Sequence, residues 1–447
     1  MFQKVLIANR GEIAVRIIQA CRDLGIISVA VYSEADREAL HAQIADEAVC
    51  IGPARAADSY LNMDNIISAA LASGCQAIHP GFGFLSENPD FAERITQAGL
   101  AFIGPTAATI RLMGDKSEAK RNAIAAGVPV ALGTDGPLRD FDEAISEAER
   151  IGYPVMLKAA SGGGGKGIRV AESVKDLKDA YDSASAEAIA NFGDGRLYME
   201  KYIHNPRHIE VQILGDNYGN VVHLFERECS VQRRHQKLIE ESPSAFVTPE
   251  LREKMTSAAV ALAKRVGYRN AGTIEFLVDN DRNFYFCEMN TRIQVEHPVT
   301  EEVTGVDLVC EQLRVAAGEP LSFKQEDLTI RGHAIECRIN AEDPPRNFAP
   351  CPGTLVSLHL PGGPGVRVDS AAYQGYKIPP FYDSMIGKLI VYGADREQAI
   401  VRMRRALAEM LFEGVVTATD YQMHILCSKA FVEANFNVNS IANGDFD

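Results

Sequence analysis

Alternating polar side chains run through residues 288–296, where five positions carry groups that bind cations or anions. They are Glu288, Asn290, Arg292, Gln294 and Glu296. Side chains alternate between the two faces of a strand, so an extended conformation would place all five on one face. Carboxylate and amide oxygens suit Mg²⁺, whereas an arginine, a glutamine and a carboxylate can hold and deprotonate a small anion. The row therefore predicts a metal site that continues into an anion site.

The segment before this row supplies another carboxylate. Residues 273–278 are β-branched or apolar, residues 279–283 have turn chemistry, and an aromatic run begins at Phe284, which predicts a β-hairpin. Glu275 would then face Glu288 across the hairpin, and two such carboxylates repel each other unless a cation lies between them. We therefore expect Glu275, Glu288 and Asn290 to bind metal. The alternative is a solvated sheet face with ion pairs.

The composition of the 447-residue chain is that of an ordinary globular protein, and the length suggests roughly three domains. A net charge of −15 argues against a nucleic-acid partner. The nine cysteines are scattered and form no CxxC pair, which indicates a reduced protein without a disulfide or zinc framework. No apolar run approaches membrane-spanning length, and no signal segment is visible. We expect a soluble, cytoplasmic protein that does not bind membranes.

Strands and helices are predicted to alternate over the first 114 residues, which indicates a parallel sheet covered by helices. The predicted strands are Lys4–Ala8, Ser28–Tyr32, Gln76–His79 and Leu100–Ile103. The predicted helices are Glu12–Leu24, Asn65–Ala72 and Pro89–Ala98. The turn after the first strand lacks the G-x-G-x-x-G fingerprint, which argues against a dinucleotide site.

The remaining chain is predicted to form a central unit, with a smaller unit inserted in it, and a region of short strands. The central unit has helices Asp115–Gly127 and Pro249–Val266, strands His208–Leu214 and Val221–Glu226, and the hairpin. The inserted unit has strands Val155–Ala159, Ile168–Ala171 and Leu197–Lys201, and a helix near Val174–Ala190. The last region has strands Ala334–Ile339, Thr354–Leu360, Val366–Ser370 and Lys388–Tyr392, then helix Arg396–Leu411.

A glycine-rich run, Ser161–Gly167, lies between two predicted strands. A dinucleotide loop leads from a strand into a helix, so the formal match of this run to G-x-G-x-x-G is misleading. Four consecutive glycines suit a mobile flap whose amides fold over phosphates. Lys158 ends the preceding strand and Lys116 opens the central helix, and together with the hairpin they predict a nucleoside triphosphate site. A flexible surface turn is the alternative.

Positive charge is concentrated in Arg227–Lys237, although the chain as a whole is acidic. Gln232, His235 and Lys237 follow a strand that should neighbour the hairpin, so they can face a polyphosphate and an anion. A helix or a solvated charged surface is the competing interpretation. Of the ten histidines, His208 and His235 are the ones expected to have a role at the site.

These segments closely resemble the biotin carboxylase family of ATP-grasp enzymes, over nearly the whole chain. The resemblance is carried by Ile7–Ala14, His79–Asn88, Ser161–Gly167, Tyr198–Tyr202, Asn205–Gln212, Arg227–Lys237, Glu288–Pro298 and Arg331–Asp343. It implies an α/β (α+β) fold in three parts. These would be a Rossmann-like N-terminal domain over 1–114, an ATP-grasp domain over 115–330 with a mobile lid over about 131–203, and a β-rich C-terminal domain over 331–447.

The resemblance also implies a role for each matching residue. The ATP phosphates would be bound by Lys116, Lys158, Gly164 and Gly165. Residues that would contact the adenine are Glu200, Lys201 and Ile203. The nucleotide site would be completed by His208, Gln232 and His235. Two Mg²⁺ or Mn²⁺ ions would be bound by Glu275, Glu288 and Asn290. Bicarbonate would be held by Lys237, Arg292, Gln294 and the Val295 amide. Glu296 would be the general base, and Arg338 would stabilise the biotin enolate.

The implied reaction converts bicarbonate to carboxyphosphate with ATP and then passes the carboxyl group to N1′ of biotin on a carrier protein. The chain ends at Asp447 without a biotinylation motif, so it resembles the separate subunit of a multi-subunit enzyme, most often the acetyl-CoA carboxylase of fatty acid synthesis. The implied partners are a biotin carboxyl carrier protein, carboxyltransferase subunits and a second copy in a homodimer. Lys166, where some relatives have arginine, is the one departure noted, and it concerns only the lid.

Three alternatives remain at this point. A biotin carboxylase subunit of another acyl-CoA carboxylase or of a 2-oxoacid (pyruvate-type) carboxylase would carry the same motifs. A nicotinamide dehydrogenase would suit the alternating N-terminal elements, but the first turn lacks the required glycines. A non-catalytic nucleotide sensor would not need metal ligands, a base and an anion clamp together.

Overall fold

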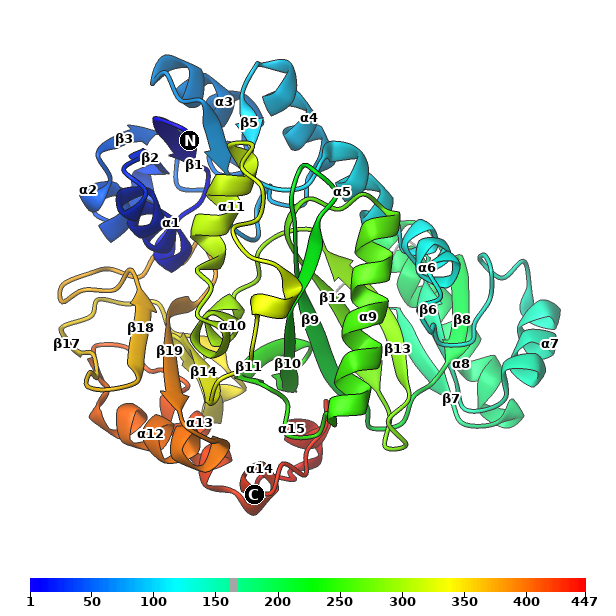
Figure 1. Cartoon of the computed structure of the whole chain (residues 1–447). Helices are drawn as coiled ribbons and strands as arrows, with labels where there is room; N and C mark the ends of the chain where they lie inside the picture. The colour runs from blue at the N-terminus through cyan, green and yellow to red at the C-terminus, as the bar shows by residue number, and fades with distance from the viewer. Residues whose placement is uncertain (161–166) are drawn as a thin grey trace.

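A five-stranded parallel sheet forms the N-terminal part of the computed structural model, which describes residues 1–160 and 167–447 (Figure 1). Its strand order is β3-β2-β1-β4-β5. The strands are β1 (Lys4–Ile7), β2 (Ile27–Tyr32), β3 (Glu47–Cys50), β4 (Ala77–His79) and β5 (Ala101–Phe102). The helices are α1 (Gly11–Asp23), α2 (Leu40–Ile44), α3 (Met63–Ala72), α4 (Pro89–Gln97) and α5 (Ala107–Gly114). The apolar runs of β1 and β2 are buried, as expected for parallel strands covered by helices.

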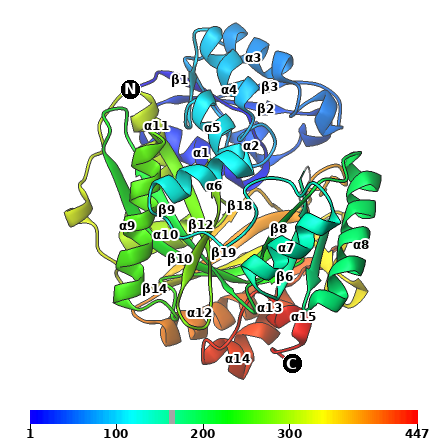
Figure 2. The same ribbon diagram turned by 90° about the vertical axis from the view of Figure 1, so that its right-hand side faces the viewer.

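A small antiparallel sheet in the order β7-β6-β8 forms a peripheral unit (Figure 2). Its strands are β6 (Val155–Ala159), β7 (Ile168–Ala171) and β8 (Leu197–Lys201), and its helices are α7 (Phe141–Ile151) and α8 (Val174–Phe192). Leu157 of β6, Ala148 of α7 and Leu177 of α8 share a core of their own. The unit therefore has the compactness expected of a lid. Most of the glycine-rich run, including Gly164, Gly165 and Lys166, lies outside the described residues.

An eight-stranded antiparallel sheet runs through the rest of the molecule in the order β13-β12-β9-β10-β11-β14-β19-β18. Its strands are β9 (Arg207–Gly215), β10 (Val221–Arg233), β11 (Gln236–Ser242), β12 (Asn270–Val278), β13 (Phe284–Asn290), β14 (His333–Asn340), β18 (Val366–Ser370) and β19 (Met385–Gly393). Strand β11 pairs with β14. The sheet thus crosses the boundary predicted at residue 331, and the two domains expected there share a backbone hydrogen-bond network.

Helices pack on both halves of this sheet. Helix α9 (Pro249–Arg265) covers β9 and β12, where Met255 meets Val211 and Ile274 in one core, and α6 (Lys116–Ala125) joins the same core through Ala119. The other half is covered by α12 (Arg396–Glu409) and α13 (Thr419–Cys427). The remaining elements are α10 (His297–Thr304), α11 (Leu308–Ala316), α14 (Lys429–Val432), α15 (Ser440–Asn443), β15 (Glu342–Asp343), β16 (Ala349–Pro350), β17 (Ser357–His359) and β20 (Leu411–Glu413).

The C-terminal half of the large sheet has one apolar and one charged face. Ile335, Cys337 and Leu389 belong to the core under α12. On neighbouring strands, charged residues stand in register: Glu240 opposite Glu336, Arg338 opposite Lys388, and Asp369 opposite Lys388. Side-chain alternation places this row on the opposite face from the apolar core. The charged face therefore continues toward the hairpin that was predicted to carry the metal.

Most predicted elements are confirmed, with ends shifted by a few residues, but the polar row of residues 288–296 does not continue as a strand. Strand β13 ends at Asn290, because the Thr291 backbone N–H donates to Glu87 Oε1 at 3.0 Å instead of joining a sheet. Glu296 stands at the N-terminus of α10. The prediction for 354–360 was also too long, since only Ser357–His359 is a strand. The sequence prediction missed α2, α5, α7, α10, α11, α13, α14, α15, β3, β11, β15, β16 and β20.

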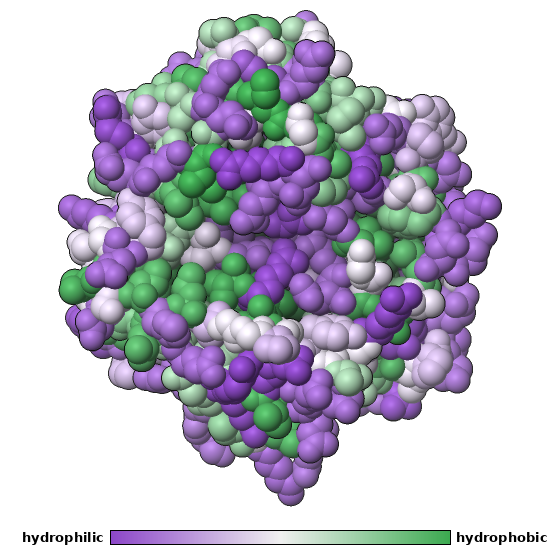
Figure 3. Space-filling model, turned by 60° about the vertical axis from the view of Figure 1, so that its left-hand side comes forward, coloured by the Kyte–Doolittle hydropathy of each residue, from purple (hydrophilic) through white to green (hydrophobic). Residues whose placement is uncertain are grey.

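Hydrophilic residues predominate over the face in Figure 3, with hydrophobic residues scattered among them, and exposed large apolar side chains such as Leu132, Ile189 and Val356 come from distant parts of the chain. Within the described ranges, every helix is too short or too polar to span a bilayer. The two termini lie far apart on the molecule (Figures 1 and 2).

Candidate active site

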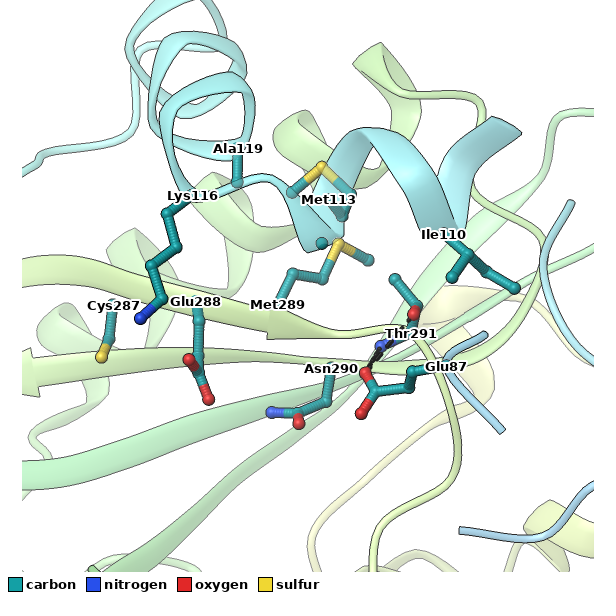
Figure 4. Close-up of a pocket in the computed structure, with 11 residues that line it drawn as sticks. Glu87, Ile110, Met113, Lys116, Ala119, Cys287, Glu288, Met289, Asn290 and Thr291 are labelled. Carbon is teal, nitrogen blue, oxygen red and sulfur yellow. Dashed lines mark hydrogen bonds between the residues drawn. The ribbon is translucent and has the colours of Figure 1, made fainter. Parts of the chain in front are cut away.

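A pocket of about 230 Å³ opens between helices α5 and α6 and strand β13 (Figure 4). Lys116 projects into it from the first turn of α6, and Glu288 and Asn290 project from β13. Glu87, from the N-terminal part, lies beside Asn290 and Thr291. The predicted phosphate-binding lysine and two predicted metal ligands are therefore brought together by elements that are separate in the sequence.

Glu275 and Glu288 are directly opposite each other in the β12–β13 register, as predicted from the hairpin. Partial desolvation and the charge of Glu275 raise the pKa of Glu288. Among the described residues, no hydrogen bond or ion pair engages the Glu288 carboxylate. Hard oxygen ligands under mutual repulsion fit Mg²⁺ or Mn²⁺, because a cation placed between them would relieve that repulsion.

Asn290 is hydrogen-bonded through both the nitrogen and the oxygen of its side-chain amide. Its Nδ2 donates to Glu275 Oε1 at 2.9 Å, and its Oδ1 accepts from Arg292 Nη2 at 2.8 Å. The oxygen predicted to bind metal is thus hydrogen-bonded to Arg292. An amide oxygen has two lone pairs, so this oxygen can bind a metal ion while it keeps the Arg292 hydrogen bond.

Lys237 is the centre of the anionic side chains at the site. Its Nζ lies 2.6 Å from Glu210 Oε2, 3.0 Å from Glu275 Oε1 and 2.5 Å from Glu296 Oε1. Burial would lower the pKa of Lys237, but the three carboxylates outweigh it and hold that pKa well above its ordinary value. Lys237 is therefore a permanent cation that connects a predicted metal ligand with the predicted base.

Glu296 is buried and bound through both oxygens. Oε1 accepts from Lys237, and Oε2 accepts from Arg338 Nη2 at 2.9 Å. Burial would raise the pKa of Glu296, but Lys237 and Arg338 outweigh it and leave the pKa below its usual value. Arg338 also donates from Nε to Glu240 Oε1 at 2.5 Å. The carboxylate is consequently ionised and correctly charged to accept a proton.

His208 carries a positive charge at neutral pH. Its Nε2 lies 3.1 Å from Glu275 Oε2 and 3.8 Å from Glu210 Oε2. Burial would lower the pKa of this imidazole, but Glu275 and Glu210 raise it to about 9. A cation here suits a site for polyphosphate.

The loop 291–296 leaves its predicted extended path and is held by contacts from three directions. Arg292 Nε donates to Glu87 Oε2 at 2.8 Å. Gln294 Nε2 donates to Glu275 Oε1 at 2.8 Å. The Val295 carbonyl accepts from the buried Lys388 Nζ at 2.9 Å. Gln294 and Lys237 thus both contact Glu275, whereas Arg292 binds Glu87 and Asn290, and a bent loop replaces the predicted strand alternation.

The lid contributes a second group of predicted residues. Lys158 Nζ lies 2.6 Å from Glu200 Oε2, and Lys120 Nζ lies 3.4 Å from Glu200 Oε1. Burial would lower the pKa of Lys158, but Glu200 keeps it raised. Lys201 Nζ donates to the Gly152 and Tyr153 carbonyls at 3.0 and 2.7 Å. Glu200 thus has one partner in the lid, Lys158, and one on α6, Lys120, whereas the partners of Lys201 lie within the lid.

Three of the predicted residues lie around the edges of the site. Ile203 is half-buried in the segment that leaves β8. Gln232 is buried and pairs with Lys237 across the β10–β11 hairpin. His235 is exposed at the tip of that hairpin with φ +64°. The basic segment is therefore neither a helix nor a solvated run, since most of it forms two buried strands.

Several residues of the site were not found from the sequence. Glu210 alternates with His208 on β9, a period-two pattern that could have identified it. Glu87, Glu240, Lys388 and Lys120 carry no local signal, because their partners are distant in the chain.

Three family models match the chain in succession. The "Biotin carboxylase, N-terminal domain" model matches residues 1–110, the "Carbamoyl-phosphate synthase L chain, ATP binding domain" model matches 115–324, and the "Biotin carboxylase C-terminal domain" model matches 336–443. The chain belongs to the biotin carboxylase family. The family resemblance and the α/β fold expected from the sequence are confirmed, and the nicotinamide dehydrogenase alternative is wrong.

Individual members of the biotin carboxylase family match over the full length. Biotin carboxylase 1 of Bacillus subtilis is 56% identical over 446 residues, which cover 100% of this chain and 99% of that protein. One pyruvate carboxylase subunit from Methanothermobacter thermautotrophicus is 57% identical, over 96% of this chain and 88% of that protein. The biotin carboxylase domain dimer of 2-oxoglutarate carboxylase from Hydrogenobacter thermophilus, solved with MgADP, ADP and bicarbonate, is 51% identical. It superposes with a TM-score of 0.94 and covers 100% of this chain and 99% of that chain.

Proposed function

We propose that this chain carboxylates biotin with ATP and bicarbonate, by way of carboxyphosphate. The observation that carries the proposal is the position of Lys237, which contacts Glu275 on the metal side and Glu296 on the acceptor side. A single cation thus links the place of phosphoryl transfer with the place of proton removal. That arrangement suits an anion that is deprotonated and phosphorylated in one site.

Nucleotide binding is assigned to the pocket and the lid. Lys116 and Lys158 would neutralise the phosphates, and Gly164 and Gly165 of the glycine-rich run would bind them through backbone N–H groups. His208, Gln232 and His235 would complete the nucleotide site, and Glu200, Lys201 and Ile203 would meet the adenine. Phosphoryl transfer depends mainly on positioning and charge neutralisation, which is what cationic side chains supply. The Lys158–Glu200 pair of 2.6 Å holds that lysine in place before a phosphate arrives.

Glu275, Glu288 and Asn290 are proposed to hold the Mg²⁺ or Mn²⁺ ions, which when bound neutralise the charge that builds up on the phosphates. The proposal is supported by the opposed, repelling carboxylates of β12 and β13. Glu275 is already oriented by hydrogen bonds from Asn290 and Gln294. Those hydrogen bonds hold the Glu275 carboxylate in one orientation before any ion binds.

Bicarbonate is assigned to Lys237, Arg292, Gln294 and the Val295 amide, with Glu296 as the base. Bicarbonate is a poor nucleophile until it loses its proton, and a buried, ionised carboxylate beside the anion can take that proton. Arg338 is proposed to stabilise the biotin enolate, since a guanidinium stays charged and fits planar anions. Its bond to Glu296 Oε2 places it beside the base.

The wider assembly is also proposed. We assign the chain three domains, 1–114, 115–330 with a lid at about 131–203, and 331–447. The N-terminal domain has its own sheet and the lid its own sheet and core, whereas the last two domains share the large sheet. We propose that it works as a homodimer with biotin on a carboxyl carrier protein and with carboxyltransferase subunits. Acetyl-CoA is the proposed final acceptor. A 2-oxoacid acceptor is the second candidate, because two relatives belong to pyruvate and 2-oxoglutarate carboxylases.

The reaction is tested by incubating the purified chain with ATP, Mg²⁺, labelled bicarbonate and free biotin. Label should appear in carboxybiotin, and it should require ATP. Transfer to purified biotinylated carrier should be faster, because the carrier raises the effective concentration of biotin at the site. Carboxylation of an acyl-CoA by this chain alone would contradict the proposal.

A further inference from the structure

Arg227 is the largest side chain that is fully buried, and the roles assigned above do not use it. It lies on β10, the strand beside β9 and β11 in the large sheet. A buried guanidinium is costly unless its charge is paired and its hydrogens are bound. We therefore expect Arg227 to have a charged partner and an acceptor for each of its N–H groups.

All five N–H hydrogens of Arg227 have an acceptor. Nε donates to Glu210 Oε1 at 2.6 Å. Nη1 donates to Gln212 Oε1 at 2.7 Å and to Thr300 Oγ1 at 3.0 Å. Nη2 donates to Thr273 Oγ1 at 3.2 Å and to Gln294 Oε1 at 2.8 Å. A guanidinium has five donors in a rigid plane, so five acceptors leave it a single orientation.

One of these acceptors, Gln294, belongs to the anion site. Gln294 presents Oε1 to Arg227, so its Nε2 must point the other way, where it donates to Glu275 Oε1. An amide nitrogen carries two hydrogens, and the second is available to an anion. If the amide were reversed, its oxygen would face the anion and repel it. Arg227 therefore fixes the polarity of the Gln294 amide.

Glu210 transmits a second constraint. Its Oε1 accepts from Arg227, and its Oε2 accepts from Lys237 Nζ at 2.6 Å. The carboxylate of Glu210 is thus held on one side and positions Lys237 on the other. Both the ammonium and the amide that are assigned to bicarbonate are connected to one buried guanidinium.

We propose that Arg227 is a positioning residue for the bicarbonate site, acting through Gln294 and Glu210 without touching the substrate. This inference rests on the proposed function, because it concerns the same anion. Lysine in its place would keep the charge but offer three donors from one point, and it could not reach five acceptors spread around a plane. The fork of donors, rather than the charge alone, is what the site requires.

The test is the Michaelis constant for bicarbonate in ATP hydrolysis by Arg227→Lys. We expect the KM for bicarbonate to rise about 10-fold or more and the KM for ATP to change less than about twofold. In a Gln294→Ala background the same substitution should raise the KM for bicarbonate about threefold or less, because the group through which Arg227 acts is gone. Equal effects in both backgrounds, or a matching loss of ATP affinity, would overturn the inference.

Two further variants keep the test decisive. Arg252→Lys is the matched control, since Arg252 pairs with the buried Glu226 but contacts no residue of the anion site, and it should leave the KM for bicarbonate unchanged. If Arg227→Lys does not fold, Thr300→Val removes one Nη1 acceptor at nearly constant shape and should raise the KM for bicarbonate about threefold. An unchanged KM in Thr300→Val would then overturn the inference. Wild-type ATP hydrolysis indifferent to bicarbonate would instead overturn the proposed function, and this inference with it.

Discussion

Lys237 Nζ and Glu296 Oε1 lie 2.5 Å apart, and the other oxygen of Glu296 is bound to Arg338. The proposed base is therefore fixed between two cations. Those cations keep Glu296 ionised, and they also lower its basicity. Bicarbonate bound to Lys237 would compete for the charge that now stabilises Glu296, which would make the carboxylate a stronger base when substrate is present.

Replacement of the base is the first prediction. Glu296→Ala should lower the rate of bicarbonate-dependent ATP hydrolysis by about 10²–10⁴-fold, while the affinity for ATP changes little. The reason is that Glu296 contacts Lys237 and Arg338 and lies beyond the metal carboxylates. Steady-state kinetics combined with nucleotide-binding calorimetry would check this. A loss confined to ATP binding would reassign Glu296 to the metal ligands.

The second prediction concerns the loss of one carboxylate that is proposed to bind metal. Glu288→Gln should reduce activity by about 10²-fold or more and raise the Mg²⁺ concentration needed for half-maximal rate. Glu413→Gln is a matched control, because Glu413 is an exposed carboxylate on β20, far along the chain from the pocket. Full activity of Glu288→Gln with an unchanged Mg²⁺ requirement would show that Glu288 is not a ligand.

The third prediction concerns Arg338. Arg338→Ala should depress carboxyl transfer to biotin more than it depresses ATP binding. It should also raise the pKa of Glu296, because one of the two cations that lower it is removed. The acid limb of the pH–rate profile should consequently move to higher pH than in the wild type. An acid limb that stays in place would mean that Arg338 does not influence the base.

The fourth prediction concerns the stability of the fold at low pH. Glu241 is buried, 2.8 Å from His333 Nε2 and 2.7 Å from Arg396 Nε, and although burial opposes it, Arg396 and His333 lower its pKa from 4.5 to about 2. A depressed carboxyl pKa stabilises the fold above the unfolded value of 4.5, and this stability is lost as pH falls toward 2. The contribution at neutral pH is about 3 kcal/mol.

Thermal unfolding of Glu241→Gln and the wild type at a series of pH values would test that contribution. The wild type should have the higher melting temperature at pH 7. The difference in melting temperature between the two proteins should narrow as the pH is lowered from about 5 to 3. A gap that is constant over this range would show that the Glu241 ion pairs do not stabilise the fold.

Sequence patterns predicted those parts of the site whose residues are close together in the chain. Glu275 and Glu288 were placed opposite each other correctly, because strand alternation and a short turn determine their register. The extended row failed beyond Asn290, since Thr291 bonds to Glu87, 204 positions away. A solvated surface remained a competing interpretation of the basic segment, whereas Arg227 is buried among acceptors up to 73 positions away. No short sequence window contains such contacts.

The central claim is that one site couples ATP cleavage to bicarbonate, and the rate of ATP hydrolysis with and without bicarbonate tests it most directly. The purified chain is assayed with saturating MgATP in bicarbonate-depleted buffer, and bicarbonate is then added, in the presence and absence of free biotin. We expect hydrolysis to be slow without bicarbonate, to rise on its addition, and to lose that rise in Glu296→Ala. A rate of ATP hydrolysis that is the same with and without bicarbonate would contradict the account.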